Sequence, residues 1–100
     1  MKKIVNGTVY DTEMAAKVVS HDTESGWAEG ITTHFSVSVT ETLYRTKNGN
    51  WFLIRERRGV LFEREPVFLP MTEEEAYNWL HRFNEIELLR QYFRDRVLEG

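Results

Sequence analysis

Residues 41–58 constrain the fold of this chain more than any other stretch, because two runs of strand-forming residues flank KNGN at 47–50. Asparagine followed by glycine between such runs is the strongest short-range signal for a β-hairpin, since both residues tolerate a positive φ angle. The sequence therefore predicts an antiparallel hairpin whose turn contains Asn48 and Gly49. What this hairpin exposes depends on its register.

The sequence allows two registers for this hairpin. A two-residue type I′ loop pairs Thr46 with Trp51. A three-residue loop closed by Gly49 with a G1 bulge pairs Arg45 with Trp51 instead, and the slip of one residue exchanges the two faces. In either register large apolar side chains lie on both faces. We therefore expect helices to cover one face, and a partner, a second copy in a homodimer or another strand to cover the other.

Other stretches predict additional strands. A second Asn-Gly pair makes residues 2–10 a shorter hairpin, and residues 31–40 alternate apolar and polar side chains with the period of a half-buried strand. Short extended segments are expected at residues 18–20, 60–62 and 67–69. Pro66 indicates a turn or a sheet edge before the last of them.

Two stretches between the strands predict other structure. TEMAAK at 12–17 contains helix formers and favours a short helix, with Asp11 or Thr12 as its cap. HDTESGWAEG at 21–30 is polar and contains two glycines, which is typical of a loop. Trp27 in this loop either anchors it to the core or is an exposed interface anchor.

The C-terminal third predicts helices. Thr72 and Glu75 form a capping box, in which each side chain accepts a hydrogen bond from the other residue's backbone. Apolar side chains then recur at helical spacing; they are Ala76, Trp79, Leu80, Phe83, Ile86, Leu89, Phe93 and Val97. Asn84 with Glu87 repeats the capping pattern, so we expect two helices broken at Asn84, with one continuous helix over 73–98 as the alternative. The predicted fold is α+β, a single domain over 1–100 with an antiparallel sheet built on β-hairpins and two C-terminal helices packed on one face.

Composition narrows the classes of protein. With 41% hydrophobic and 29% charged residues, the chain falls within the globular range and away from disorder. The absence of cysteine excludes disulfides and cysteine-ligated metals, and it fits a reducing cytoplasm. No apolar run approaches the roughly 18 residues of a membrane span. We therefore expect a cytoplasmic protein that does not enter membranes.

No combination of residues indicates catalysis. His21, His34 and His81 are expected in a loop, a strand and a helix with no shared spacing. The glutamates at 73–75 are explained by the positive end of a helix dipole, and the glycines form no phosphate-binding loop. We expect a protein that is not an enzyme and that has no metal or other cofactor.

The formal net charge of −3 is unevenly distributed. Residues 41–64 hold six basic against three acidic side chains, whereas the chain on either side is acidic. The candidate partner-binding residues are Tyr44, Arg45, Arg55, Arg57 and Arg58. Basic and aromatic side chains on a strand surface also suit stacking on bases and neutralising phosphates. The alternative without a partner is a solvated strand end in which the cations pair with glutamates of the same ribbon.

Three blocks of the sequence resemble a family of short proteins encoded on bacterial phages, plasmids and conjugative elements. The blocks are KKIVNG at 2–7 with VYDTE at 9–13, ETLYRTK at 41–47 with Gly49 and WFL at 51–53, and LPMTEEEA at 69–76 with Trp79. Where such proteins often carry a glycine-rich stretch after the second hairpin strand, this chain has RERRG at 55–59. The resemblance supplies no catalytic residues. It implies an origin on mobile elements, whose small proteins frequently block host defences, with anti-CRISPR inhibitors as the best-known kind.

The expected function is therefore a non-enzymatic, protein-binding inhibitor from a mobile genetic element. Its target would be a host protein or ribonucleoprotein complex, such as a CRISPR effector, in the cytoplasm of the host cell. The alternative is a nucleic-acid-binding accessory protein that uses the arginine-rich hairpin. If the partner itself handles nucleic acid, its basic channels would instead attract the acidic residues around 73–75, Glu85 and Glu87.

Overall fold

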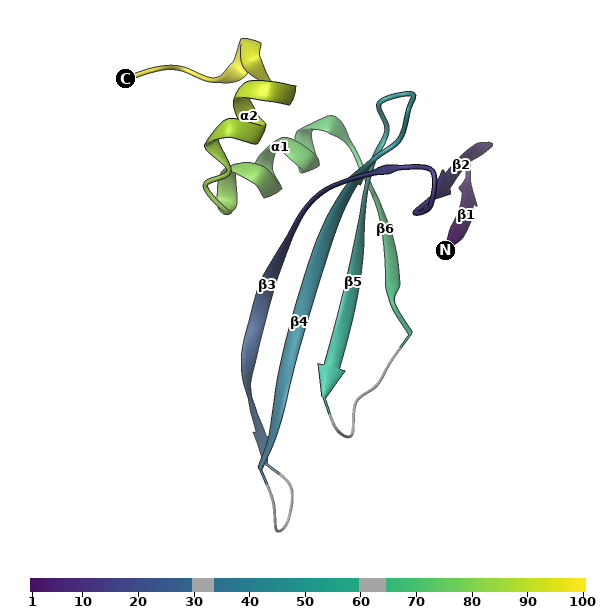
Figure 1. The fold of residues 1–100 in the computed structure, drawn as a ribbon, viewed down its shortest axis with the longest axis vertical. Coiled ribbons are helices and arrows are strands. Elements are labelled where there is room, and N and C mark those ends of the chain that lie inside the picture. Colours follow the sequence, from purple (N-terminus) through teal and green to yellow (C-terminus); the bar gives the residue numbers. More distant parts are fainter. Residues whose placement is uncertain (30–33, 60–64) are drawn as a thin grey trace.

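Residues 1–29, 34–59 and 65–100 are described by a computed structural model, in which a four-stranded antiparallel sheet carries two helices near one end (Figure 1). The sheet has the strand order β3-β4-β5-β6, and β1 and β2 form a separate two-stranded sheet. The strands are β1 Lys2–Val5, β2 Thr8–Asp11, β3 Ala16–Glu29, β4 His34–Arg45, β5 Trp51–Gly59 and β6 Val67–Met71. The helices are α1 Glu73–Arg82 and α2 Ile86–Tyr92, followed by a 3₁₀ turn, η1, at Arg94–Arg96. The predicted α+β fold is confirmed.

The β4–β5 hairpin adopts the register with a three-residue loop. Arg45 pairs with Trp51, and the Thr46 backbone N–H donates to the Asn50 carbonyl at 2.8 Å. Gly49 has a φ of 85° and supplies the positive angle that closes the loop. The type I′ alternative is therefore excluded. Alternation along the strands then separates two faces of the sheet, one covered by the helices and one opposite.

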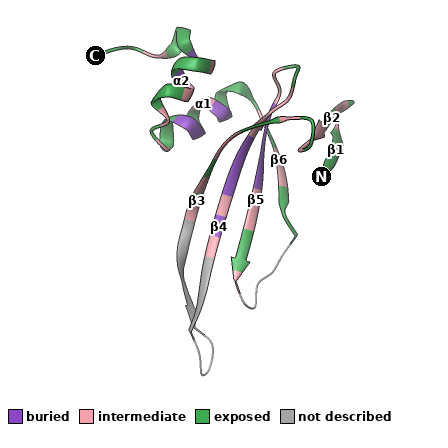
Figure 2. Cartoon of the chain, in the orientation of Figure 1, coloured by how far each residue is buried: buried purple, intermediate pink, exposed green. Residues whose placement is uncertain are grey.

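The face covered by α1 and α2, called here the helical face, contains the larger core. Leu43 and Leu53 pair across β4 and β5, and both are almost fully buried. The core residues of this face are Leu43, Trp51, Leu53, Ala76, Trp79, Leu80, Leu89 and Phe93. Figure 2 shows that burial in β4 and β5 is concentrated at the end of the sheet near the helices, whereas the far end of β5 is exposed. The helices thus cover only part of the sheet.

The opposite face, called here the aromatic face, is covered by rings rather than by helices. Phe52 is 0% exposed because Tyr44 stacks on it at 4.9 Å between centroids and Phe68 lies 5.4 Å away. Tyr10 adds an edge contact to Phe52 at 5.5 Å and lies 5.2 Å from Phe68. Since Tyr10 belongs to β2, the N-terminal hairpin covers this part of the face, so of the three alternatives (a partner, a second copy or another strand) the cover comes from another strand.

The N-terminal hairpin forms as predicted, but the short helix after it does not. Asn6 and Gly7 both have positive φ angles, 50° and 80°, as a type I′ turn requires. The predicted helix at 12–17 is wrong, because only one turn forms there before β3 begins at Ala16. The Asp11 carbonyl accepts from the Ala15 N–H at 2.9 Å, and its side chain caps the Glu13 N–H at 3.0 Å. Strand pairing of β3 with β4 overrides the local helix propensity.

The predicted loop at 21–30 is also wrong where the structure describes it. β3 continues to Glu29 and pairs with β4 over its whole length, with register irregularities at Lys17/Val19 and Asp22/Glu24. Polar residues are accommodated because this strand forms one edge of the sheet. The side chain of Trp27 and the strand predicted at 60–62 lie outside the described parts.

β6 forms the other edge of the sheet. The segment predicted at 67–69 is extended by two residues, and Pro70 pairs with Phe52 in the register with β5. Proline is tolerated at an edge because it removes a backbone donor that no neighbouring strand needs. Pro66 immediately precedes the strand, as the sequence predicted.

Two separate helices follow, as predicted, but for a different reason. The capping box is present: the Glu75 N–H donates to Thr72 Oγ1 at 3.1 Å, and the Thr72 N–H donates to Glu75 Oε1 at 2.9 Å. Asn84 does not cap α2, because its φ of 56° is left-handed and an N-cap needs an extended backbone. It ends α1 instead. The Asn84 N–H donates to the carbonyl of His81 and the Glu85 N–H to that of Leu80, which is a Schellman motif.

The second helix is shorter than its apolar spacing predicted. α2 ends at Tyr92, and Val97 packs against the core from beyond η1 rather than from the helix. The predicted continuous helix over 73–98 is therefore excluded. None of the helices in the described ranges is long and apolar enough to cross a membrane.

Candidate functional site

The structure divides the five predicted partner-binding residues between the two faces of the sheet. Arg45, Arg55 and Arg57 follow the alternation of Trp51 and Leu53 and lie on the helical face. Tyr44 and Arg58 lie on the aromatic face, in register with Phe52 and Ser38. The five residues therefore do not form one patch.

Arg45 has a packing role next to the helices. Its guanidinium carbon lies 5.4 Å from the ring centre of Trp51 and 5.3 Å from that of Tyr92. Both contacts are in the range of cation–π interactions. Its Nε atom is buried and has no hydrogen-bond partner among the described residues. A guanidinium held in this way is poorly placed to bind a partner.

The two residues of the aromatic face also have local partners. Tyr44 stacks on Phe52, and burial raises the pKa of its hydroxyl above the ordinary value, with a further rise caused by the Glu56 carboxylate. Arg58 lies 3.5 Å from that same carboxylate, and its side chain is largely exposed. An exposed pair of this kind contributes little to stability, so Arg58 stays accessible.

Arg55 is part of a buried polar bridge between the sheet and α1. Glu41 pairs with Arg55 across β4 and β5, and its side chain is only 5% exposed. Its Oε2 accepts from Arg55 Nε at 2.8 Å, while its Oε1 accepts from the Trp79 indole N–H at 3.0 Å. A buried carboxylate is tolerated when donors satisfy its oxygens in this way. The bridge fixes the position of the Arg55 guanidinium.

A polar hollow of about 160 Å³ lies next to this bridge, on the helical face beyond the end of α1. Its lining residues are Thr23, Val39, Glu41, Arg55, Arg57 and Arg82. Arg57 comes two residues after Arg55 on β5, and Arg82 is the last residue of α1. Among the side chains that the structure describes, Glu41 is the one carboxylate that lines this hollow, and it is within ion-pair distance of Arg55 alone. Three arginine side chains and one carboxylate among the described side chains thus line the same hollow.

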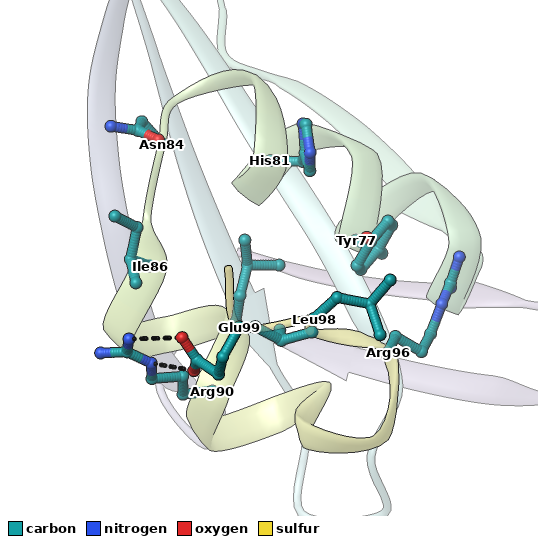
Figure 3. A pocket seen from close by; sticks show the side chains of 10 residues that line it. Tyr77, His81, Asn84, Ile86, Arg90, Arg96, Leu98 and Glu99 are labelled. Carbon is teal, nitrogen blue, oxygen red and sulfur yellow. Dashed lines mark hydrogen bonds and ion pairs between the residues drawn. The ribbon is translucent and has the colours of Figure 1, made fainter.

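A second hollow shows the opposite arrangement of charge. It has a volume of about 450 Å³ and lies between α1, α2 and the C-terminal segment (Figure 3). Arg90 donates to Glu99 through two nitrogens at 2.9 and 3.0 Å and to Glu87 at 2.6 Å. These hydrogen bonds lower the pKa of Glu99 and raise that of Arg90. Because its charges are already paired, this hollow offers no charge to a ligand.

Arg96, which also lines the second hollow, is similarly occupied. It donates to both carboxylate oxygens of Glu74, at 2.7 and 3.1 Å, and lies 3.8 Å from the ring centre of Tyr77. The acidic helix residues suggested for a basic partner are therefore largely engaged within the molecule: Glu74 and Glu87 in ion pairs, Glu75 in the capping box. This weakens the case for an acidic docking surface on the helices.

The histidines do not form a site in the described parts of the chain. His21 stacks on Phe83 at 4.4 Å, and its Nε2 lies 3.8 Å from Glu85 Oε1. Within residues 1–29, 34–59 and 65–100, the structure contains no group of three or more histidine or acidic side chains that could hold a metal. His21 therefore belongs to the packing between β3 and the helices.

Arg82 and Thr23 were not predicted as neighbours of the arginines on β5. Arg82 lies in the last turn of α1, three residues after Trp79, whose indole contacts Glu41. This spacing places Trp79 and Arg82 on adjacent turns of one side of the helix. It predicts that Arg82 lies near the β5 arginines only once α1 is known to pack on β5. Thr23 lay in the predicted loop, so its place on a strand was not anticipated.

Comparisons with models of protein families, with curated proteins and with solved structures found no match for this chain.

Proposed function

We propose that the protein is a non-enzymatic inhibitor from a mobile genetic element, and that it binds a surface of a host defence complex such as a CRISPR effector. Its origin rests on the resemblance of the three sequence blocks to short proteins of phages and plasmids. The binding role is supported by the arrangement of charge on the helical face.

One observation carries the binding role. Arg55, Arg57 and Arg82 line one hollow at the boundary of the helix-covered part of the sheet, and among the described side chains Glu41 is the one carboxylate that lines it with them. Most arginines elsewhere in the described parts are paired with glutamates or packed on rings. A local excess of guanidinium groups at the edge of a covered region is typical of an interface, where arginine is over-represented.

A protein partner is favoured over nucleic acid by the positions of the aromatic residues. Trp51 and Phe52 are buried, and Tyr44 is stacked against Phe52 on the opposite face from the hollow. Their ring faces are thus not presented beside the arginines, where they would be needed to stack bases. The formal net charge of −3 also opposes binding to a polyanion.

The proposal is tested by capture from host cells. Tagged protein is incubated with host lysate before and after nuclease treatment, and the captured complex is assayed for defence activity with increasing amounts of the inhibitor. We expect a protein component to remain bound after nuclease treatment, and activity to fall in proportion to occupancy at stoichiometric ratios. Loss of capture after nuclease treatment, with oligonucleotide binding that weakens steeply with salt, would instead establish the nucleic-acid alternative.

Charge reversal identifies the surface used. Arg57→Glu is the suitable variant, because Arg55→Glu would place a second carboxylate against buried Glu41 and destabilise the fold. Arg58→Glu is the matched control: it changes the neighbouring residue on the same strand but alters the opposite face. We expect the first variant to lose the captured complex and the second to retain it. Retention by both variants would show that the partner uses another surface.

A further inference from the structure

We propose that the hollow between β5 and the end of α1 is an oxyanion site, and that its ligand is a carboxylate from an acidic segment of the partner protein. It is lined by Arg55, Arg57 and Arg82, together with Thr23 and Glu41. That this carboxylate belongs to a protein rests on the proposed function, which assumes a protein partner. The site itself rests only on the arrangement of these side chains.

Part of the site is held in place by hydrogen bonds within the protein. Arg55 is fixed by two contacts of 2.8 Å to Glu41, through Nε and a terminal nitrogen. Glu41 is fixed in turn by the Trp79 indole, which belongs to the same helix as Arg82. The sheet and α1 are thus joined at the point where the hollow forms. Arginines that are positioned before binding lose less conformational entropy when a ligand arrives.

The charges around the hollow are only partly paired among the described residues. Glu41 neutralises Arg55, whereas no ion pair is formed by Arg57 or Arg82 among the described residues. The Arg82 guanidinium lies 5.1 Å from the ring centre of Phe83, which supports its orientation without reducing its charge. Guanidinium groups that form no ion pair with the described side chains attract an anion, and each can donate to a carboxylate through paired N–H groups.

The volume of the hollow limits the ligands that it can hold. A hollow of about 160 Å³ accommodates a carboxylate or a single phosphate group, but it is below the roughly 300 Å³ of the smallest typical pockets for larger ligands. A nucleotide would enter with its phosphate alone, because the hollow is lined by no aromatic residue among the described side chains. A glutamate or aspartate side chain needs nothing beyond the guanidinium groups. The carboxylate of a protein is therefore the ligand that this site favours.

The site can be tested without the partner, with acetate as the probe. The Nε–Hε signals of the arginines are followed by ¹H–¹⁵N NMR in the whole protein at constant ionic strength, and are assigned with Arg57→Lys and Arg82→Lys. We expect the Arg57 and Arg82 signals to shift with one saturable constant on the order of millimolar, and the Arg58 signal to shift only weakly and without saturation. Equal, non-saturating shifts of all three signals would overturn the site.

Whether the carboxylate belongs to the partner protein is tested with the captured complex. Arg57→Gln and Arg82→Gln should each weaken its binding about tenfold or more, whereas Arg58→Gln should leave it within about threefold. Unchanged folding of all three variants is checked by near-ultraviolet circular dichroism, to which the buried Trp51 and Trp79 contribute.

The outcomes separate the two proposals. Saturable acetate binding with no protein captured would retain the oxyanion site and reject the proposed function. Capture that is insensitive to both glutamine variants would retain the proposed function and reject this inference. If a single-stranded oligonucleotide displaces acetate and binds more tightly than the captured protein, the ligand is a phosphate group and the assignment to a protein carboxylate is wrong.

Discussion

The two faces of the sheet are buried at the same strands but by different means. On the helical face, Leu43 and Leu53 are covered by side chains from helices that follow the last strand of the sheet in the sequence. On the aromatic face, Phe52 is covered by rings of its own sheet and by Tyr10 of the N-terminal hairpin. Both faces reach near-complete burial at β5, although in the described parts of the chain the helices cover only the first. A sheet of this size therefore acquires a two-sided core without a second layer of helices.

The two faces also differ in where their charged side chains lie. The helical face includes a buried carboxylate and the arginines that line the hollow, since helix packing ends part of the way along the strands and leaves a boundary. The aromatic face has a gradual transition from rings to the exposed Arg58–Glu56 pair. A partner-binding site is accordingly expected where a covered region ends abruptly.

The largest effect is expected from truncating adjacent residues that point to opposite faces. Phe52→Ala should lower the free energy of unfolding by about 3 to 5 kcal/mol and Leu53→Ala by about 2 to 5 kcal/mol, because both leave cavities in fully packed surroundings. Urea unfolding measures each loss. A near-native value for Phe52→Ala would show that the aromatic face is not a core, and the comparison of the two faces would fail.

A smaller loss is expected from Glu41→Gln on the helical face. The amide retains an acceptor for the Trp79 indole but loses the charge that holds Arg55, whose side chain is 40% exposed and can be partly rehydrated. We expect a loss of about 1 to 3 kcal/mol in the free energy of unfolding. Restoring a carboxylate through Glu41→Asp should recover little, because the shorter side chain does not reach both donors. An unchanged stability in Glu41→Gln would mean that the bridge is dispensable.

Tyr10→Ala tests whether the N-terminal hairpin is part of the aromatic core. Tyr10 is half-buried, so its removal should cost about 1 to 2 kcal/mol. Val9→Ala is the matched control on the same strand; Val9 is 60% exposed and should change stability by less than about 0.5 kcal/mol. Equal effects of the two variants would show that β1 and β2 do not stabilise the sheet.

The smallest effect concerns pH and leaves both faces unchanged. Hydrogen bonds from Arg96 hold the pKa of Glu74 below its ordinary value of 4.5. A lowered pKa means that the pair contributes stability above pH 4.5 and loses it as the pH falls through the folded-state value. Carbon NMR of the Glu74 carboxyl should give a titration midpoint below 4.5 that rises in Arg96→Gln. A midpoint that is the same in both proteins would contradict the pair.

The elements specified by local rules were predictable from the sequence. The Asn-Gly turns use positive φ angles, at Asn6 and Gly7 in the N-terminal hairpin and at Gly49 in the β4–β5 hairpin. The Thr72 capping box satisfies two backbone donors at a defined spacing. The break between the helices was also predictable at Asn84. Its mechanism was not, since Asn84 suits both an N-cap and a left-handed C-terminal position, and only the positions of the flanking carbonyls distinguish them.

Elements that depend on distant partners were not predictable. The polar residues 21–29 form a strand because β4 offers a complete ladder of backbone partners, and this information lies outside the segment. The candidate site behaves in the same way. The alternation on β5 was visible, but the register that places Arg55 opposite Glu41, and the helix crossing that adds Arg82, are both long-range properties. For this reason the sequence predicted the arginines as one patch.

Pro70 has a consequence for self-association. A sheet can recruit further strands through either of its edges, and a chain with two receptive edges can propagate into a fibre. Here the β6 edge contains a residue without a backbone N–H, so a strand added along β6 would meet one donor fewer than along β3. We therefore expect strand addition to the four-stranded sheet to favour its β3 edge over its β6 edge.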